Sequence, residues 1–126
     1  MTLPYDPDLA DRMVDMDPRL LHLLTQEITS FGLWDALRYF LETGSERATM
    51  DEIGLAVGRD SDIMLSILGE LTTRGWLARR VNEEGITEYV LTQENERRTL
   101  LDHFHATLQE RTFRLQAIYH WTQSTS

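Results

Sequence analysis

The chain has 126 residues and a formal net charge of −9 at pH 7, from 12 Arg, no Lys and 21 acidic residues, a balance that repels nucleic acid at long range. This length favours one domain and leaves little room for a catalytic domain beside it, and the absence of Cys excludes disulfides and thiol chemistry. No stretch approaches the roughly 20 apolar residues of a membrane-spanning helix, and the N-terminus is acidic, so we expect a cytoplasmic protein.

Residues 1–17 form an acidic leader. This segment carries five Asp against one Arg and contains Pro. We expect it to be loosely ordered or to lie over a partner subunit. A single domain is then expected over 18–121, with its core at 31–92, followed by a short tail over 122–126.

Two apolar helices are predicted before the centre of the chain. Asp17 suits the cap of a first helix, because Asp accepts from free backbone N–H groups and the next residue is a Pro. The Leu-rich stretch that follows is too apolar to be exposed. A second helix is predicted from Phe31 to Leu41, where apolar residues recur at helical spacing, and Gly44 closes it.

Two short helices joined by a tight turn are predicted next. Thr49 and Glu52 have the spacing of a capping box, which begins the first helix, and Gly58 ends it. Asp60 is placed to cap the second helix, over 61–74.

A β-hairpin is predicted after these helices. The stretches 76–81 and 86–91 have the composition of strands, and Gly85 supplies the positive φ that the intervening turn requires. The expected fold class is therefore mainly α with a small β-hairpin. In detail, it is a winged helix-turn-helix with an added N-terminal helix and a long C-terminal helix for dimerisation.

The sequence over 49–92, TMDEIGLAVGRDSDIMLSILGELTTRGWLARRVNEEGITEYVLT, resembles the winged-helix family of transcription regulators. The resemblance implies a three-helix core with a β-wing, in which the second helix of the motif enters a DNA major groove and the wing touches the DNA backbone. A weaker resemblance links 31–44, FGLWDALRYFLETG, to the N-terminal dimerisation domain of small-molecule O-methyltransferases. It implies at most a role in dimerisation, not methyl transfer.

One long helix is predicted over 93–121. Its apolar residues recur near a heptad spacing, with Arg111 at one position in the middle. We interpret this seam as the interface of a homodimer; the alternative is that the helix packs on its own domain. The seam comprises Leu101, Phe104, Leu108, Leu115 and Ile118.

The implied DNA contacts fall on the second helix of the motif and on the wing. On a helical wheel, the broad apolar side is predicted to be core: Ile63, Met64, Leu65, Ile67, Leu68 and Leu71. The opposite side has no basic residue: Asp62, Ser66, Gly69, Glu70 and Thr73. The expected contacts with DNA are Ser61, Ser66 and Thr73 to bases and Arg59, Arg74, Arg79 and Arg80 to phosphates.

The charge of the motif leaves two functions open. Residues 49–92 carry eight acidic residues and four Arg, a net charge of −4, and two Glu lie at the predicted wing tip. The four Arg either hold phosphates or pair with nearby carboxylates on a solvated surface. We expect a homodimeric winged-helix DNA-binding transcription regulator. The alternative is an acidic winged-helix module for protein interaction or dimerisation that does not bind DNA.

No catalytic or metal-binding pattern stands out. His103 and His105 would point about 200° apart on a helix and could not share a metal. No Ser-His-Asp spacing or glycine-rich phosphate loop is present, so we expect no enzyme activity, metal or cofactor. Four aromatic residues either line a small-molecule pocket or, the interpretation that we favour, belong to the core: Phe31, Trp34, Tyr39 and Trp76.

Overall fold

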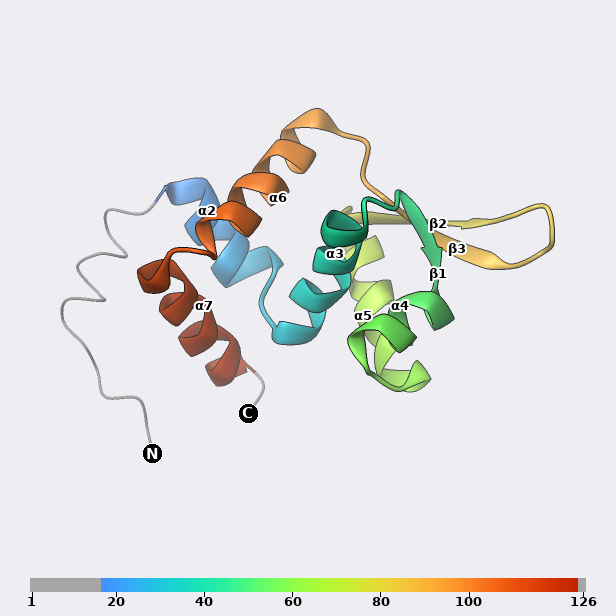
Figure 1. Cartoon of the computed structure of the whole chain (residues 1–126), viewed down its shortest axis with the longest axis horizontal. Helices are drawn as coiled ribbons and strands as arrows, with labels where there is room; N and C mark the ends of the chain where they lie inside the picture. Colours follow the sequence, from blue (N-terminus) through green and yellow to red (C-terminus); the bar gives the residue numbers. More distant parts are fainter. Residues whose placement is uncertain (1–16, 125–126) are drawn as a thin grey trace. The chain divides into compact units, whose positions relative to one another are not determined.

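The structure, a computed structural model, describes residues 17–124 (Figure 1). The predicted acidic leader, apart from Asp17, and the last two residues of the predicted tail lie outside this range. The described residues divide into two compact units, of which unit 1 comprises 17–31 with 100–124 and unit 2 comprises 32–99. In the described part of the chain, no helix is long and apolar enough to cross a membrane.

Unit 2 has the element order of the predicted winged helix. Its helices and strands follow in the order α3 (Phe31–Thr43), β1 (Arg47–Thr49), α4 (Met50–Val57), α5 (Ser61–Thr73), β2 (Leu77–Val81) and β3 (Thr87–Leu91). The strands form one antiparallel sheet in the order β1-β3-β2. The predicted fold class is thus confirmed, and the hairpin gains a third, three-residue strand that the sequence did not indicate.

The helix boundaries follow from local hydrogen bonds. The Thr49 hydroxyl accepts from the Glu52 N–H at 3.2 Å, and the Glu52 carboxylate accepts from the Thr49 N–H at 3.2 Å, so the predicted capping box begins α4. Gly58 ends α4 with a φ of 73°, a conformation that favours glycine. Asp60 stands at the cap position of α5 as expected, but its side chain makes no capping hydrogen bond.

The core of unit 2 is narrower on α5 than predicted. Met64, Leu68 and Leu71 are fully buried, whereas Ile63 and Leu65 are 48% and 56% exposed, so their assignment to the core was wrong. The helix packs against α4 and β2 on one side only. Residues at i, i+3, i+4 and i+7 fill that side, while those one position away are rotated by 100° towards solvent.

Unit 1 contains the apolar N-terminal segment and the C-terminal helices. Asp17 caps α2 (Pro18–His22), which continues into the π-helical segment η1 (Leu23–Glu27). The apolar side chains of this segment are buried, as expected: Leu20, Leu23, Leu24 and Ile28. The Trp121 indole N–H donates to the Ile28 carbonyl at 2.7 Å, which ties the two ends of unit 1 together.

The helix predicted over 93–121 is interrupted, and that prediction of one continuous helix was wrong. The structure has α6 (Asn95–Thr107) and α7 (Arg111–Ser124) with a turn between them, so α7 also extends into the predicted tail. The Phe104 ring packs edge-on against Phe113 at 5.5 Å and lies 6.3 Å from Trp121. The chain folds back because α6 and α7 can then bury their apolar sides against each other, which a straight helix could not do.

Candidate nucleic-acid interface

The exposed side of α5 carries short polar side chains. Burial of Met64, Leu68 and Leu71 fixes the rotation of the helix, and Ser61 at its first position is exposed. The residues predicted to face outward are all exposed: Asp62, Ser66, Gly69, Glu70 and Thr73. Such hydroxyl and carboxylate groups can meet the donor and acceptor edges of bases, but they include no cation for guanine.

The end of α5 is held by local hydrogen bonds. The Thr73 hydroxyl donates to the Gly69 carbonyl at 3.0 Å, so only its oxygen lone pairs are left for a base. The Arg74 guanidinium donates to the Glu70 carboxylate at 2.6 Å, one helical turn away. This pair lies at the surface, with side-chain exposures of 27% and 45%. A surface pair of this kind contributes at most about 1 kcal/mol, so a phosphate can compete for the Arg74 guanidinium.

Arg59 lies in the turn between α4 and α5 and points to α3. Its guanidinium donates to the Asp35 carboxylate at 2.9 Å. Both side chains are partly buried, with exposures of 31% and 22%. Arg59 therefore fastens the turn to α3.

The neighbouring residues Arg79 and Arg80 lie on opposite faces of the sheet. Successive strand residues alternate between the faces, and Arg79 stands opposite the buried Tyr89. The Arg79 side chain therefore lies on the inner face of the sheet, where α5 packs against β2. Arg80 stands opposite Glu88 on the outer face, where the two side chains approach to 3.8 Å.

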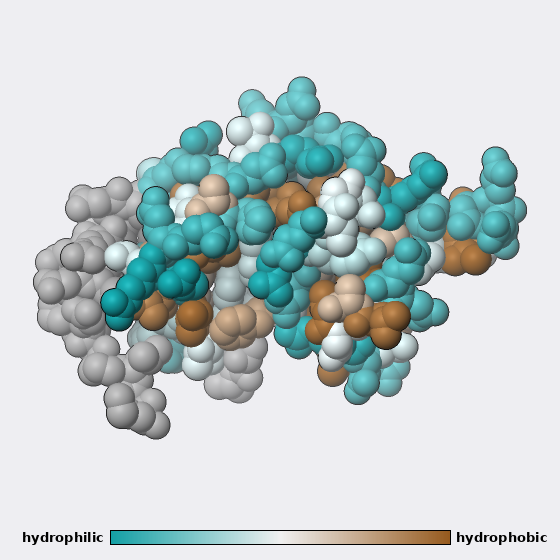
Figure 2. All heavy atoms as spheres, viewed as in Figure 1, coloured by the Kyte–Doolittle hydropathy of each residue, from teal (hydrophilic) through white to brown (hydrophobic). Residues whose placement is uncertain are grey.

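The wing tip is acidic and partly apolar. The Asn82 side-chain oxygen accepts from the N–H groups of Glu84 and Ile86 at 2.9 and 3.0 Å, which shapes the turn, and Gly85 has a φ of 80°. Glu83 and Glu84 are exposed. In Figure 2 the projecting hairpin is largely hydrophilic with one apolar spot, in agreement with exposures of 66% for Val81 and 46% for Ile86.

The fold of the chain is similar to that of solved transcriptional regulators. No family model and no characterised protein sequence matches the chain. Among solved structures, it is similar to a MarR-family transcriptional regulator from Silicibacter pomeroyi, with 19% identity, a TM-score of 0.56 and coverage of 88% of this chain and 74% of that one. It is also similar to a point mutant of S. aureus MepR bound to an oligodeoxyribonucleotide, with 16% identity, a TM-score of 0.57 and coverage of 90% and 84%.

This chain has the winged-helix fold. Its helix-turn-helix is α4 with α5, and its wing is the hairpin of β2 and β3. A second MepR mutant matches with the same TM-score of 0.57.

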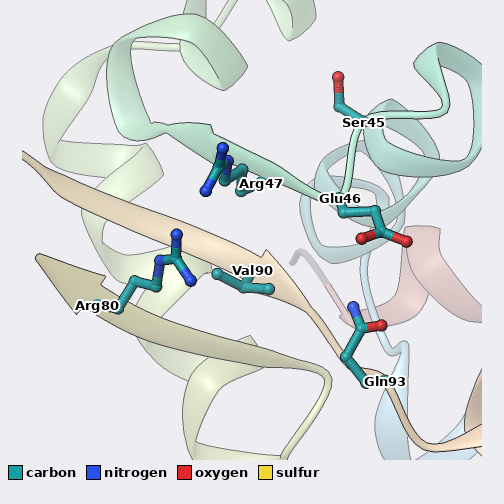
Figure 3. Close-up of a pocket in the computed structure, with 6 residues that line it drawn as sticks. All are labelled: Ser45, Glu46, Arg47, Arg80, Val90 and Gln93. Atoms are coloured by element: carbon teal, nitrogen blue, oxygen red, sulfur yellow. The ribbon is translucent and has the colours of Figure 1, made fainter. Parts of the chain in front are cut away.

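Arg47 is an exposed cation of the winged helix to which no role was assigned from the sequence. Arg47 lies in β1, on the outer face of the sheet that also carries Arg80. The two line an open hollow of about 680 Å³ at the base of the wing, together with Ser45, Glu46, Val90 and Gln93 (Figure 3). The charge pattern alone could not indicate this pair, because it depends on the pairing of β1 with β3.

The predicted dimer-interface residues all lie in unit 1. Leu101 and Phe104 are fully buried and Leu108 is 8% exposed, all within the single chain. Leu115 on α7 is 38% exposed, and Ile118 is half-buried. Tyr119, which was not on the predicted seam, is 41% exposed and lies four residues after Leu115, on the same side of α7.

Proposed function

We propose that this chain is a transcription regulator, not an enzyme, that binds double-stranded DNA as a homodimer. The observation that carries the proposal is the exposed polar side of α5, with Arg79 on the same side of the sheet as α5. The winged-helix fold and the oligodeoxyribonucleotide bound by the MepR mutant support it. A regulator of this kind must be in the same compartment as the DNA, and the proposal therefore includes a cytoplasmic location.

The proposed contacts divide by chemistry. Ser61, Ser66 and Thr73 meet base edges, because their hydroxyl groups are at the exposed side of α5. Arg74 and Arg79 bind phosphates, since they flank that side. Arg59 binds Asp35 of α3 and so holds in place the turn that precedes α5. Arg80 faces away from α5 and contributes to affinity only through its charge.

The net charge of −9 makes the proposed binding weak and dependent on salt. With Arg74 and Arg79 from each protomer, the dimer engages about four phosphates. Counterion release then lowers the affinity on the order of 100-fold between about 50 and about 200 mM salt. Loss of one arginine per protomer reduces this factor to about tenfold.

The experiment is fluorescence anisotropy with random and sequence-selected duplexes at those two salt concentrations. Arg79→Ala should weaken binding to every duplex alike and flatten the salt dependence. Arg38→Ala is the matched control, because it removes the same charge from the exposed side of α3. Ser66→Ala should instead change the preference among duplexes. A contact with a base determines sequence preference, whereas a contact with a phosphate only positions the protein on the DNA.

A second function is favoured by the wing tip. Glu83 and Glu84 repel phosphates, and the exposed Val81 and Ile86 side chains fit an apolar surface better than DNA. An acidic winged helix that binds a protein partner through this tip is the alternative. Absence of binding to any duplex at about 50 mM salt, where phosphate contacts are strongest, would reject the DNA proposal and leave this one.

A further inference from the structure

The outer face of the sheet brings two arginines together from its two edge strands. Arg47 of β1 pairs in register with Val90 of β3, and Arg80 of β2 pairs with Glu88 of the same strand. β1 and β2 lie about 10 Å apart, two strand spacings, with β3 between them. Arginine side chains can span such a gap from both sides. Figure 3 shows both guanidinium groups on the same side of the sheet, near Val90.

The central strand leaves room between the two guanidinium groups. Val90 has a short side chain, and its other neighbour in register is the exposed Ala78 of β2. The resulting hollow of about 680 Å³ is open to solvent and is large enough for a small organic molecule. Val90 supplies its apolar lining, and Glu46, Arg47 and Arg80 supply its charged lining.

Both cations are accessible to a ligand. Within residues 17–124, Arg47 forms no ion pair. The Arg80 Nε lies 3.8 Å from the Glu88 carboxylate, and the Arg80 side chain is 51% exposed. The Glu88 side chain is only 15% exposed, but an ion pair as long as this contributes little, so an oxyanion with two-pronged geometry can replace it.

The distribution of charge places the oxyanion at the base of the wing. The hollow there is lined by the two arginines and one carboxylate, that of Glu46. A neighbouring hollow of about 550 Å³ towards the tip shares both arginines but is also lined by Glu83, Glu84 and Glu88. Its lining therefore sums to −1, against +1 at the base, and only the base favours an anion.

The opposite end of the base hollow presents acceptors. In Figure 3 the Glu46 carboxylate and the Gln93 amide lie near each other, away from the two guanidinium groups. The Gln93 amide is fixed because it donates to the Leu91 carbonyl at 3.0 Å. The Glu46 backbone is fixed as well, since its carbonyl accepts from the Leu91 N–H at 2.9 Å. A ligand that spans the hollow thus meets cations at one end and a carboxylate at the other.

We propose that this hollow binds a small molecule with a carboxylate or phosphate at one end and an ammonium or hydroxyl group at the other. The oxyanion lies between Arg47 and Arg80, and the donor group binds Glu46. The site uses none of the residues that we place on DNA bases or phosphates. It therefore stands or falls independently of the proposed function.

The test is a titration of the full chain followed by amide NMR, without DNA and at constant ionic strength. The probes are inorganic phosphate, succinate and L-glutamate. Saturable shifts are expected at the amides of Arg47, Val90 and Gln93, with L-glutamate bound most tightly because it alone offers an ammonium group to Glu46. Absence of saturable shifts at these amides with all three probes would overturn the proposal.

Variants distinguish a defined binding site from nonspecific attraction of anions to positive charge. Arg47→Gln and Arg80→Gln should each weaken binding about tenfold, the loss of one charge-assisted contact. Arg79→Gln is the matched control, because it removes the same charge from the adjacent residue on the opposite face of the sheet. Equal weakening by Arg79→Gln and Arg80→Gln would contradict a defined site. Glu46→Gln should weaken L-glutamate but not succinate, and dispersed amide spectra establish that each variant is folded.

Discussion

The guanidinium of Arg59 donates to the carboxylate of Asp35 at 2.9 Å and so connects the α4–α5 turn to α3. The same carboxylate lies 3.3 Å from Arg38 on α3. Asp35 is 22% exposed and Arg59 is 31% exposed, so the pair is partly shielded from water. The direction in which α5 leaves the turn therefore depends on a side-chain contact as well as on the apolar core.

Replacement of Asp35 by Ala should destabilise the fold. The change leaves the half-buried Arg59 charge without its carboxylate, and we expect the free energy of unfolding to fall by about 1–3 kcal/mol. Arg38→Ala removes two longer ion pairs, to Asp35 at 3.3 Å and to Glu42 at 3.8 Å, from a side chain that is 46% exposed, and should cost less than about 1 kcal/mol. Urea unfolding measures both changes. Equal losses in the two variants would mean that the Arg59–Asp35 contact adds nothing beyond surface electrostatics.

The helix-turn-helix was predictable because residues close to each other in sequence determine where its helices begin and end. The capping box of Thr49 and Glu52 and the left-handed Gly58 act within a few residues of each other, and each was found where expected. The exposed side of α5 was predictable for the same reason, from helical periodicity. The errors at Ile63 and Leu65 arose because periodicity gives the direction of the core but not its width.

Features that depend on contacts distant in sequence were missed. β1 has three residues and exists because Arg47, Ala48 and Thr49 pair with β3, about 40 residues later. Arg47 could not be grouped with Arg80 without that pairing. The turn that ends α6 contains no Gly or Pro and reflects packing of Phe104 on Phe113. The opposite faces of Arg79 and Arg80, in contrast, were available from strand alternation alone.

Two glycine substitutions should change stability in opposite directions. A Cβ added at Gly54 would lie 3.2 Å from the Met64 Cγ and 3.3 Å from the Arg59 carbonyl oxygen, where α4 and α5 approach closely. We expect Gly54→Ala to destabilise the fold by about 1 kcal/mol, because overpacking outweighs the gain in helix propensity. A Cβ at Gly69 would have no neighbour within 4 Å, so Gly69→Ala should stabilise α5 by about 0.5–1 kcal/mol.

Thermal unfolding of the two glycine variants side by side provides the measurement. Gly69→Ala is the matched control, because the chemical change is the same and both sites are helical. A rise in melting temperature for both variants would show that α4 can shift away from Met64 without cost.

His120 should make the stability of the chain depend on pH. Burial lowers the pKa of His120 below its ordinary value of 6.5. Above that pH the imidazole is neutral in both the folded and the unfolded chain. As the pH falls below 6.5, the unfolded chain binds the proton first, so the free energy of unfolding decreases until the folded pKa is reached.

The check is the free energy of unfolding at about pH 7.5 and about pH 5.5, a range that spans the ordinary His value. The wild-type chain should lose more stability across this range than His120→Gln, which cannot bind the proton. Identical losses in both proteins would assign the pH dependence to other groups. Asp17 acts at lower pH, because its hydrogen bond with Arg19 lowers its pKa below 3.8.

The last prediction concerns the proposed homodimer. α7 turns one apolar side outward, at Leu115 and at Ile118 and Tyr119, which lie three and four residues after Leu115. Leu101 and Phe104 are already buried within the chain, so α7 rather than α6 offers the surface for a second copy. Light scattering at micromolar concentration should give twice the chain mass of 14.7 kDa.

Leu115→Glu should reduce that mass to a single chain, because the interface would have to bury a carboxylate without a partner. Gln109→Glu introduces the same side chain at an exposed position in the α6–α7 turn and should leave the dimer intact. If Leu115→Glu keeps the mass of the dimer, as Gln109→Glu is expected to do, the outward side of α7 is not the interface. A wild-type monomer would instead remove the dimer from the proposal. It would then halve the expected number of phosphate contacts to about two and reduce the salt dependence of DNA binding accordingly.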